Sequence, residues 1–286
     1  MPFDPLQPLG LTVGDLAPAD FRSAEFDWTG FGVSFIDSPT DERFDVGYDA
    51  LWREFGLKNE MEQRGVIEQR LAWRPEAPID GHALNYEMIV VSHDNELAAV
   101  RDHTAVVDLL NPQECVVVHL SHLLILPRFR GSGLAGWMRT LPIYTARECL
   151  TRAKVAPRLI NLVAEMEPAL TSEPGRFGRL IAYEKVGFKK IDPTHVHYLQ
   201  PDFRTACDID ADPRGPQPIP LSLITRRVGR EAETSLAGRE VRTVVESLYT
   251  MYQQSFRTSD MAINWASLAK YPHDDACVEL VPPTQV

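Results

Sequence analysis

LLILPRFRGSGLAGWM, residues 123–138, is the stretch that decides the fold of this 286-residue chain. Its apolar start continues the run CVVVHLSH, residues 115–122, and the two together predict one long strand that is buried on both faces. Gly131 and Gly133 then predict a tight turn, and the apolar spacing from Leu134 onward predicts a helix that begins at once. The first amides of a helix lack partners within the helix and, with the helix dipole, attract anions. The segment therefore predicts a phosphate cradle.

Two common phosphate-binding patterns do not describe this turn. No Lys-Ser/Thr pair follows the glycines, as a Walker A loop requires, and RGSGLAG, residues 130–136, has the wrong glycine spacing for a dinucleotide fingerprint. Arg128 and Arg130 place two cations beside the turn. Pro142 is expected to kink or interrupt the following helix, because it removes an amide donor and crowds the carbonyl of Met138.

Outward from this segment, hydrophobic periodicity predicts an α/β fold with a mixed sheet. Asp94-Asn95 is a turn pair that predicts a hairpin between two β-rich runs. The expected strands are 31–36, 85–92, 96–108, 114–126, 156–167, 188–201 and 220–228. The expected helices are 45–56, 59–73, 134–150, 177–187 and 237–256. The organisation that follows is an extended N-terminal arm (1–30), one main domain (31–230) with a loop insertion (201–218), and a C-terminal helical extension (231–286) packed on the same domain.

Charge is unevenly distributed along the chain. The formal net charge is −11, which argues against broad nucleic-acid binding. Residues 1–60 carry 4 basic and 12 acidic side chains, whereas residues 123–190 carry 12 basic and 5 acidic ones. The basic stretch suits a compact anionic ligand and coincides with the predicted cradle. The acidic remainder suits a cationic ligand by electrostatic attraction.

Compartment and metal content follow from cysteines and apolar runs. The four cysteines are scattered without zinc-ligand spacing, which indicates reduced intracellular thiols and no metal. MPFDPLQPLG, residues 1–10, lacks the basic and apolar regions of a secretory signal. The longest apolar run in the chain is too short to span a bilayer. We therefore predict a cytoplasmic protein with no nucleic-acid or membrane partner.

The pattern Leu123-x-Ile125-x-Pro127-x-x-Arg130-Gly131-x-Gly133-Leu134-Ala135 resembles the acyl-CoA motif of the GCN5-related N-acetyltransferase (GNAT) superfamily. LIAYEKVGFKKI, residues 180–191, resembles the later helix–strand segment of the same family. The resemblance implies a mixed, mostly antiparallel twisted sheet of about seven strands flanked by helices, which holds acetyl-CoA as co-substrate. The strand contacts to the cofactor would be Leu123, Leu124 and Ile125. The cradle would be Arg130, Gly131, Ser132, Gly133, Leu134, Ala135 and Gly136.

The same resemblance implies a role for Tyr183, which matches the tyrosine that often protonates the departing CoA thiolate in this family. One departure from the family pattern lies nearby. The usual asparagine after the intervening strand is not recognisable, and EMEPALTSEPGRFG, residues 165–178, takes its place. In the family this region contacts the pantetheine arm of CoA, so the departure affects the contacts expected there.

Direct acyl transfer also needs a base for the amine. By period two, His119 and Ser121 share a strand face while His122 points the other way. In several family members a residue near this point serves as base or water relay, so His119 is the first candidate, with Ser121 as relay. Glu165 and Glu167 are the alternative, provided that burial raises one pKa.

Other conspicuous side chains are interpreted as structural or solvated. His103 and Arg101 belong to the hairpin, and the helix 237–256 is assigned to core packing or to a homodimer face. The aspartates between 208 and 212 lack the downstream glutamate of a calcium loop and are read as solvated.

The leading hypothesis is a GNAT-type N-acetyltransferase, an acyltransferase that moves an acetyl group from acetyl-CoA directly to a primary amine. The alternatives are a non-catalytic CoA-binding regulatory module and an acyltransferase that uses a longer-chain acyl-CoA. The identity of the acceptor, whether small molecule, peptide or protein, stays open.

Overall fold

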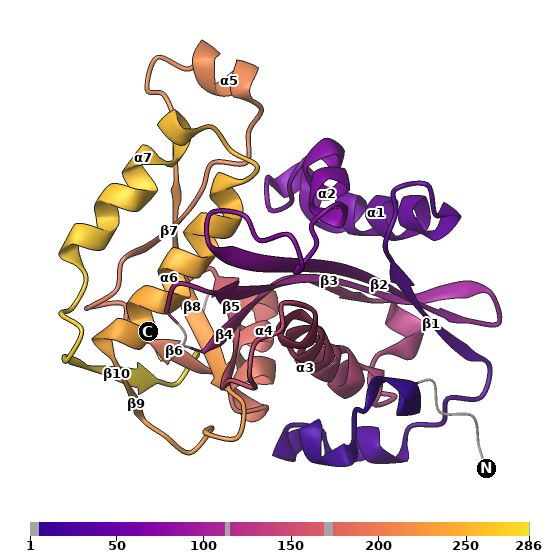
Figure 1. Ribbon diagram of the computed structural model, residues 1–286. Helices are drawn as coiled ribbons and strands as arrows, with labels where there is room; N and C mark the ends of the chain where they lie inside the picture. The colour runs from indigo at the N-terminus through magenta and orange to yellow at the C-terminus, as the bar shows by residue number, and fades with distance from the viewer. Residues whose placement is uncertain (1–5, 112–114, 169–173, 286) are drawn as a thin grey trace. The chain divides into compact units, whose positions relative to one another are not determined.

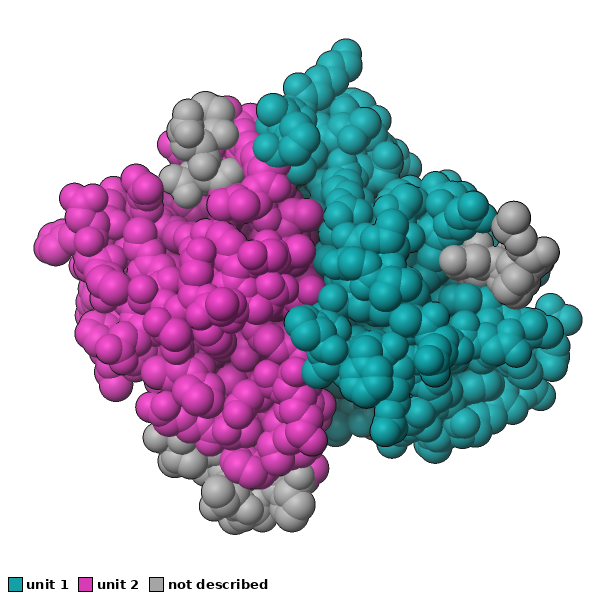
Figure 2. All heavy atoms as spheres, turned by 90° about the horizontal axis from the view of Figure 1, so that it is seen from below, with its two compact units in different colours: residues 1–79, 83–105, 120–157 teal, residues 80–82, 106–119, 158–286 magenta. Residues whose placement is uncertain are grey.

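A computed structural model describes residues 6–111, 115–168 and 174–285. The chain divides into two compact units, coloured separately in Figure 2. Unit 1 comprises residues 1–79, 83–105 and 120–157, and unit 2 comprises residues 80–82, 106–119 and 158–286. Among the described residues, no helix combines the length and the apolar character needed to cross a membrane.

Unit 1 contains the strand order β1-β2-β3-β4. These strands are β1 (Phe31–Ile36), β2 (His82–His93), β3 (Glu96–Asp108) and β4 (Val116–Ile125). β1 pairs antiparallel with β2, from Phe31 opposite His93 to Ile36 opposite Met88. Asp94 and Asn95 have positive φ angles of 49° and 65°, as a two-residue turn between twisted antiparallel strands requires. The predicted hairpin is confirmed.

Three longer helices flank these strands: α1 (Glu42–Phe55), α2 (Arg64–Leu71) and α3 (Leu134–Arg152). In Figure 1, α1 and α2 lie over one face of β2 and β3 and α3 lies over the other. Short 3₁₀ turns, η4 (Gly56–Lys58) and η5 (Pro127–Phe129), lead into α2 and α3. α3 runs on through Pro142, so of the two expected outcomes, a kink or an interruption, the interruption is wrong.

The N-terminal arm is not extended as predicted. It forms three short 3₁₀ helices, η1 (Gln7–Leu9), η2 (Val13–Asp15) and η3 (Pro18–Glu25). The arm is held on α3 because Asp20 forms an ion pair with Arg139 and the Trp137 indole donates a 2.6 Å hydrogen bond to the carbonyl of Ser23. The prediction failed because these contacts join residues more than a hundred positions apart.

Unit 2 holds the remaining strands. Residues 116–119 of β4 pair in parallel with β5 (Ile160–Met166), and β5 pairs antiparallel with β8 (Ile219–Arg227). On its other side β8 pairs with β6 (Lys189–Ile191) and β7 (Tyr198–Gln200). β6 continues to β10 (Cys277–Val281), which pairs with β9 (Ser235–Ala237). The sheet is mixed and mostly antiparallel, as predicted.

The segment 188–201, predicted as one strand, is two strands separated by a turn. The Asp192 carboxylate accepts a 2.8 Å hydrogen bond from the Thr194 amide, and Pro193 follows Asp192 directly. The Asp192 carboxylate satisfies the Thr194 amide, and Pro193 has no amide to donate. Both features favour a turn over continued pairing between strands. The break has a consequence for the site, because it leaves a gap beside β8.

Unit 2 contains α4 (Pro174–Lys185), α5 (Ala206–Ala211), α6 (Gly238–Gln253), α7 (Thr258–Ser267) and the 3₁₀ turn η6 (Leu268–Lys270). The helix predicted at 237–256 is α6, whose apolar face includes Val241, Val244 and Leu248, all fully buried. The region 231–286, predicted as helical, also supplies β9 and β10. α5 lies within the predicted loop 201–218.

Candidate functional site

The predicted cradle in unit 1 has the backbone form of an anion site. Gly131 and Gly133 have φ angles of 77° and 106°, and α3 begins at the next residue, Leu134. The Ser132 hydroxyl donates to the carbonyl of Phe129 at 2.8 Å and accepts from the Leu134 amide at 3.3 Å. These bonds fix the turn against the strand end. Positive φ at both glycines favours them over other residues here.

Several amides of this turn have no acceptor. Within the described part of the chain, the amides of Gly131, Ser132, Gly133 and Ala135 donate no hydrogen bond. Successive unsatisfied amides at the start of a 19-residue helix form a concave, positively polarised nest. Gly131 and Ser132 are exposed, so an anion can reach this nest from solvent.

Arg130 adds the cation. Its Nε donates a 3.0 Å hydrogen bond to the carbonyl of Ile125, which holds the side chain beside the end of β4. Its guanidinium makes no ion pair with any described residue. Leu123, Leu124 and Ile125 on this strand end are half-buried, as residues that contact a ligand along one edge would be.

Most of the arginines in and around α3 form ion pairs with carboxylates of the fold. Four other arginines of unit 1 form ion pairs with carboxylates of the same unit: Arg128 with Glu96, Arg139 with Asp20, Arg147 with Asp15, and Arg152 with Glu76. The uneven charge predicted an anionic ligand. Part of the positive charge instead pairs with the acidic N-terminal arm and with neighbouring segments. Arg130 is the cradle cation that stands apart from this pairing.

Gly136 does not belong to the exposed cradle. A Cβ built on Gly136 would lie 2.1 Å from the Ser23 hydroxyl, and the residue is buried under the arm. By contrast, a Cβ on Gly131 meets no atom within 4 Å. Gly136 is thus required by packing of the arm, which corrects its assignment as a phosphate contact.

A buried polar network in unit 2 contains two of the predicted catalytic residues. His119 Nε2 lies 3.0 Å from Glu165 Oε2, and the two side chains are 3% and 6% exposed. The Glu165 carboxylate also accepts hydrogen bonds from Tyr198, from Gln200 at 3.0 Å and from Tyr252 at 2.8 Å. β4, β5, β7 and α6 therefore meet at one carboxylate.

The hydrogen-bond donors around Glu165 keep its carboxylate ionised. Burial alone would raise the pKa of the carboxyl, but the hydrogen bond and charge of His119, with the hydrogen bonds of Tyr198 and Tyr252, lower it below its ordinary value. The condition attached to Glu165 as a base, a pKa raised by burial, is not met. Glu165 is therefore an ionised carboxylate saturated by hydrogen-bond donors, which argues against it as the base.

The other predicted residues have plainer surroundings. Tyr183 on α4 is half-buried, its ring lies edge-to-face on Phe188 at 4.9 Å, and its hydroxyl has no hydrogen-bond partner within the described residues. Glu167 forms ion pairs with Arg176 and Arg179 of α4, at 2.6 and 3.2 Å. Glu167 is therefore a structural partner of that helix. Residues 169–173 of the segment that replaces the family's asparagine lie outside the described residues.

Sequence reasoning missed Tyr198, Gln200 and Tyr252. Tyr252 was assigned to the core face of a helix, and Tyr198 and Gln200 fell in a strand with no recognised motif. His122 was correctly set apart from His119, but its own partner in unit 1 was missed. Its Nδ1 lies 2.9 Å from Asp102 Oδ1 and its Nε2 lies 2.9 Å from the carbonyl of Glu60.

His103 is fully buried, and its Nε2 lies 2.7 Å from the Thr145 hydroxyl, in keeping with its structural interpretation. Across the described ranges, no group of three or more His, Cys, Asp or Glu side chains is placed to hold a metal ion.

No family model matches the chain, and no curated protein matches it. Among solved structures, it is similar to an acetyltransferase from Streptococcus agalactiae, with 10% identity over 69% of this chain and 98% of that one and a TM-score of 0.38. It is also similar to an acetyltransferase of the GNAT family from Streptococcus pneumoniae, with 14% identity, 69% and 100% coverage and a TM-score of 0.33.

A third similar structure is that of yncA from Salmonella typhimurium with acetyl-CoA, at 13% identity, 71% and 97% coverage and a TM-score of 0.33. Of these three proteins, the one from Streptococcus pneumoniae is of the GNAT family, which is the family that the motifs at 123–136 and 180–191 resemble.

Proposed function

We propose that this protein is an N-acetyltransferase that transfers an acetyl group from acetyl-CoA directly to a primary amine. The observation that carries the proposal is the nest formed by the unsatisfied amides of Gly131, Ser132, Gly133 and Ala135, beside Arg130. A pyrophosphate carries the charge and the oxygen acceptors that such a nest lacks. The motif that surrounds the nest resembles the acyl-CoA motif of GNAT enzymes, which supports acetyl-CoA as the co-substrate over other phosphate compounds.

The chemistry is a direct displacement at the thioester carbonyl. The amine nitrogen forms a C–N bond to the carbonyl carbon, the C–S bond breaks, the amine gives up a proton and the thiolate receives one. Only a neutral amine has the lone pair for this attack, so a base is required. Tight positioning of both reactants supplies a further large part of the rate.

His119 is our base. In this proposal the ring donates from Nε2 to the ionised Glu165, and Nδ1 takes the proton of the amine. The carboxylate also stabilises the imidazolium that forms, which is the division of labour of a base and its orienting carboxylate. Since only 3% of the side chain is exposed, the proton reaches the ring through a relay, for which Ser121 or a water is proposed.

Tyr183 is our acid for the thiolate. Its phenol is half-buried, and no described residue holds the hydroxyl, so the O–H group can turn toward a leaving group. The match to the family's tyrosine supports this role. His119 and Tyr183 would then act at opposite ends of the reaction, one removing a proton and the other donating one.

Binding and turnover test the proposal separately. Acetyl-CoA should raise the melting temperature of the wild type, because a ligand that binds only the native state stabilises it. Arg130→Ala should weaken binding by about tenfold or more, since a charge-assisted contact is lost. Arg152→Ala is the matched control, because Arg152 sits at the other end of α3 and pairs with Glu76. Equal binding by both variants would exclude the cradle.

Turnover is read as free thiol released from acetyl-, propionyl- and palmitoyl-CoA with a panel of primary amines. Release with acetyl-CoA and an amine supports the enzyme, and a preference for palmitoyl-CoA would change the donor. CoA binding with no acyl transfer to any amine would favour the second candidate, a CoA-binding regulatory module.

A further inference from the structure

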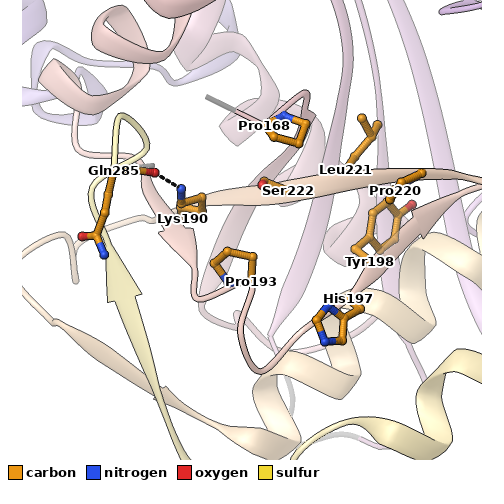
Figure 3. A pocket seen from close by; sticks show the side chains of 9 residues that line it. All are labelled: Pro168, Lys190, Pro193, His197, Tyr198, Pro220, Leu221, Ser222 and Gln285. Carbon is orange, nitrogen blue, oxygen red and sulfur yellow. Dashed lines mark hydrogen bonds between the residues drawn. The ribbon is translucent and has the colours of Figure 1, made fainter. Parts of the chain in front are cut away.

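A cavity of ≈ 260 Å³ lies within unit 2, and Tyr198 is one of the residues that line it (Figure 3). Its walls are largely apolar: Pro168, Pro193, Pro220 and Leu221 line it, together with Lys190 and Tyr198. Small-molecule sites have this composition, an apolar lining with a few placed polar groups, and the volume of this cavity lies slightly below their usual range of about 300–1,000 Å³.

The cavity exists because β8 changes partner along its length. β6 pairs with β8 at Ile224 and Thr225, whereas β7 pairs with it at residues 219–221. Ser222 and Leu223 thus have no pairing residue on that side among the described strands. The turn 192–197, which splits the segment predicted as one strand, leaves this space open.

Lys190 supplies a buried cation at one end. The residue is 5% exposed, and its ammonium donates one hydrogen bond to the carbonyl of Gln285, drawn as a dashed line in Figure 3. Within the described chain, no carboxylate lies at ion-pair distance from its Nζ. Burial lowers the pKa of Lys190, with Asp192 opposing that shift. An ammonium has three N–H donors, so a ligand anion here would gain a partner that the fold does not provide.

Tyr198 connects the cavity to the carboxylate of Glu165. Its ring forms part of the cavity wall, and its hydroxyl donates to Glu165 Oε1. Glu165 in turn contacts His119. The cavity therefore has two electrostatic poles: an ammonium with no carboxylate at ion-pair distance among the described residues, and a wall tyrosine backed by the carboxylate and the candidate base.

We propose that this cavity binds the acceptor substrate, and that the acceptor is a small amine that also carries a carboxylate, such as an amino acid. The carboxylate pairs with Lys190, a short hydrocarbon chain packs against the prolines and Leu221, and the amino group lies toward Tyr198. This inference rests on the proposed acetyl transfer for its functional meaning. It replaces the cationic acceptor expected from overall charge with one that bears both charges.

A binding experiment without acyl donor tests the cavity alone. Butyrate should bind the wild type, as followed by calorimetry and by NMR of the His197 ring at the cavity wall. Lys190→Met should weaken butyrate binding by about tenfold or more, and Lys190→Arg should retain part of it. Lys189→Met is the matched control, because the Lys189 ammonium donates instead to the carbonyl of Glu233 at 2.5 Å. The arginine variant keeps the test valid if the methionine variant does not fold.

A turnover experiment tests the substrate class with matched pairs of amines. With acetyl-CoA, the kcat/KM for the amine that carries a carboxylate should be about tenfold or more higher than that for its matched amine without one. The matched pairs are 4-aminobutyrate with propylamine, or phenylalanine with phenethylamine. Lys190→Met should abolish the difference. Acyl transfer that ignores the carboxylate, with no butyrate binding, would overturn this inference and leave the proposed function standing. Lys190-dependent butyrate binding with no acyl transfer to any amine would instead overturn the proposed function and leave the cavity as a carboxylate site.

Discussion

Two histidines three positions apart on β4, His119 and His122, each contact a buried carboxylate, yet their surroundings give them opposite chemistry. In unit 1, His122 Nδ1 faces Asp102 and its Nε2 faces the carbonyl of Glu60, which can only accept. Both ring nitrogens must therefore donate. The Asp102 carboxylate outweighs burial and raises the pKa of His122 to about 9, so this ring is a cation at neutral pH.

In unit 2, His119 shares its carboxylate with three other donors. Tyr198, Gln200 and Tyr252 all donate to Glu165, so this carboxylate does not depend on the His119 ring as its one partner. The comparison teaches that a buried His–carboxylate pair is a structural ion pair or a candidate base according to what satisfies the remaining polar atoms.

The largest expected effect is on activity. His119→Ala should lower kcat by about 10²–10⁴-fold, because a positioned base is lost, while the affinity for CoA is unchanged. Steady-state kinetics with a fixed amine, together with a thermal-shift titration of CoA, separates the two. A kcat within about threefold of the wild type would exclude His119 as the base.

The second effect is on stability. His122→Gln should destabilise the protein by roughly 3–5 kcal/mol, because it leaves the Asp102 carboxylate buried without its cation. Urea unfolding at pH 7 measures this, and kcat should stay near that of the wild type at temperatures where the variant is folded. A large loss of kcat in the folded variant would erase the distinction between the two histidines.

Alkaline pH should reproduce part of that loss in the wild type. Because the folded pKa of His122 is raised from 6.5 to about 9, its contribution is fully present below pH 6.5 and is lost as the pH rises through about 9. The shift corresponds to roughly 3 kcal/mol at most. The free energy of unfolding should change more between pH 6 and pH 10 in the wild type than in His122→Gln. An equal change in the two proteins would contradict the raised pKa of His122.

Exchanging each carboxylate for an amide sharpens the contrast. Glu165→Gln should lower kcat by about 10–100-fold, because the carboxylate proposed to orient the His119 ring loses its charge. Asp102→Asn should lower stability and leave kcat near that of the wild type. Equal kcat values in the two variants would show that Glu165 does not act through the base.

The smallest effects come from the tyrosines that donate to each carboxylate. Tyr252 donates to Glu165 at 2.8 Å and Tyr86 donates to Asp102 at 3.1 Å. Each Tyr→Phe change should cost roughly 1–3 kcal/mol of stability, since a hydrogen bond to a charged group is lost. Only Tyr252→Phe should also slow acyl transfer. Equal kcat values in both variants would place Tyr252 outside the site.

The features that were predictable from sequence are those whose causes are local. The turn at Asp94-Asn95 follows from two residues that tolerate positive φ, and the face of α6 follows from the spacing of its valines. Features built from distant contacts were missed or misread. Ser23 covers Gly136, and Tyr252 reaches Glu165 from 87 positions away, and no periodicity in either segment encodes such a meeting.

The sequence by itself determined the Gly131–Gly133 turn and the helix start that follows it, because glycine φ angles, the missing Cβ at Gly131 and the unpaired amides at a helix start are properties of one short segment. Only the tertiary structure decided which carboxylate each histidine contacts, which glutamate stays ionised and where a buried lysine meets an apolar cavity. Protonation and binding depend on partners supplied by other strands and helices, and in this chain those partners come together only when the fold is complete.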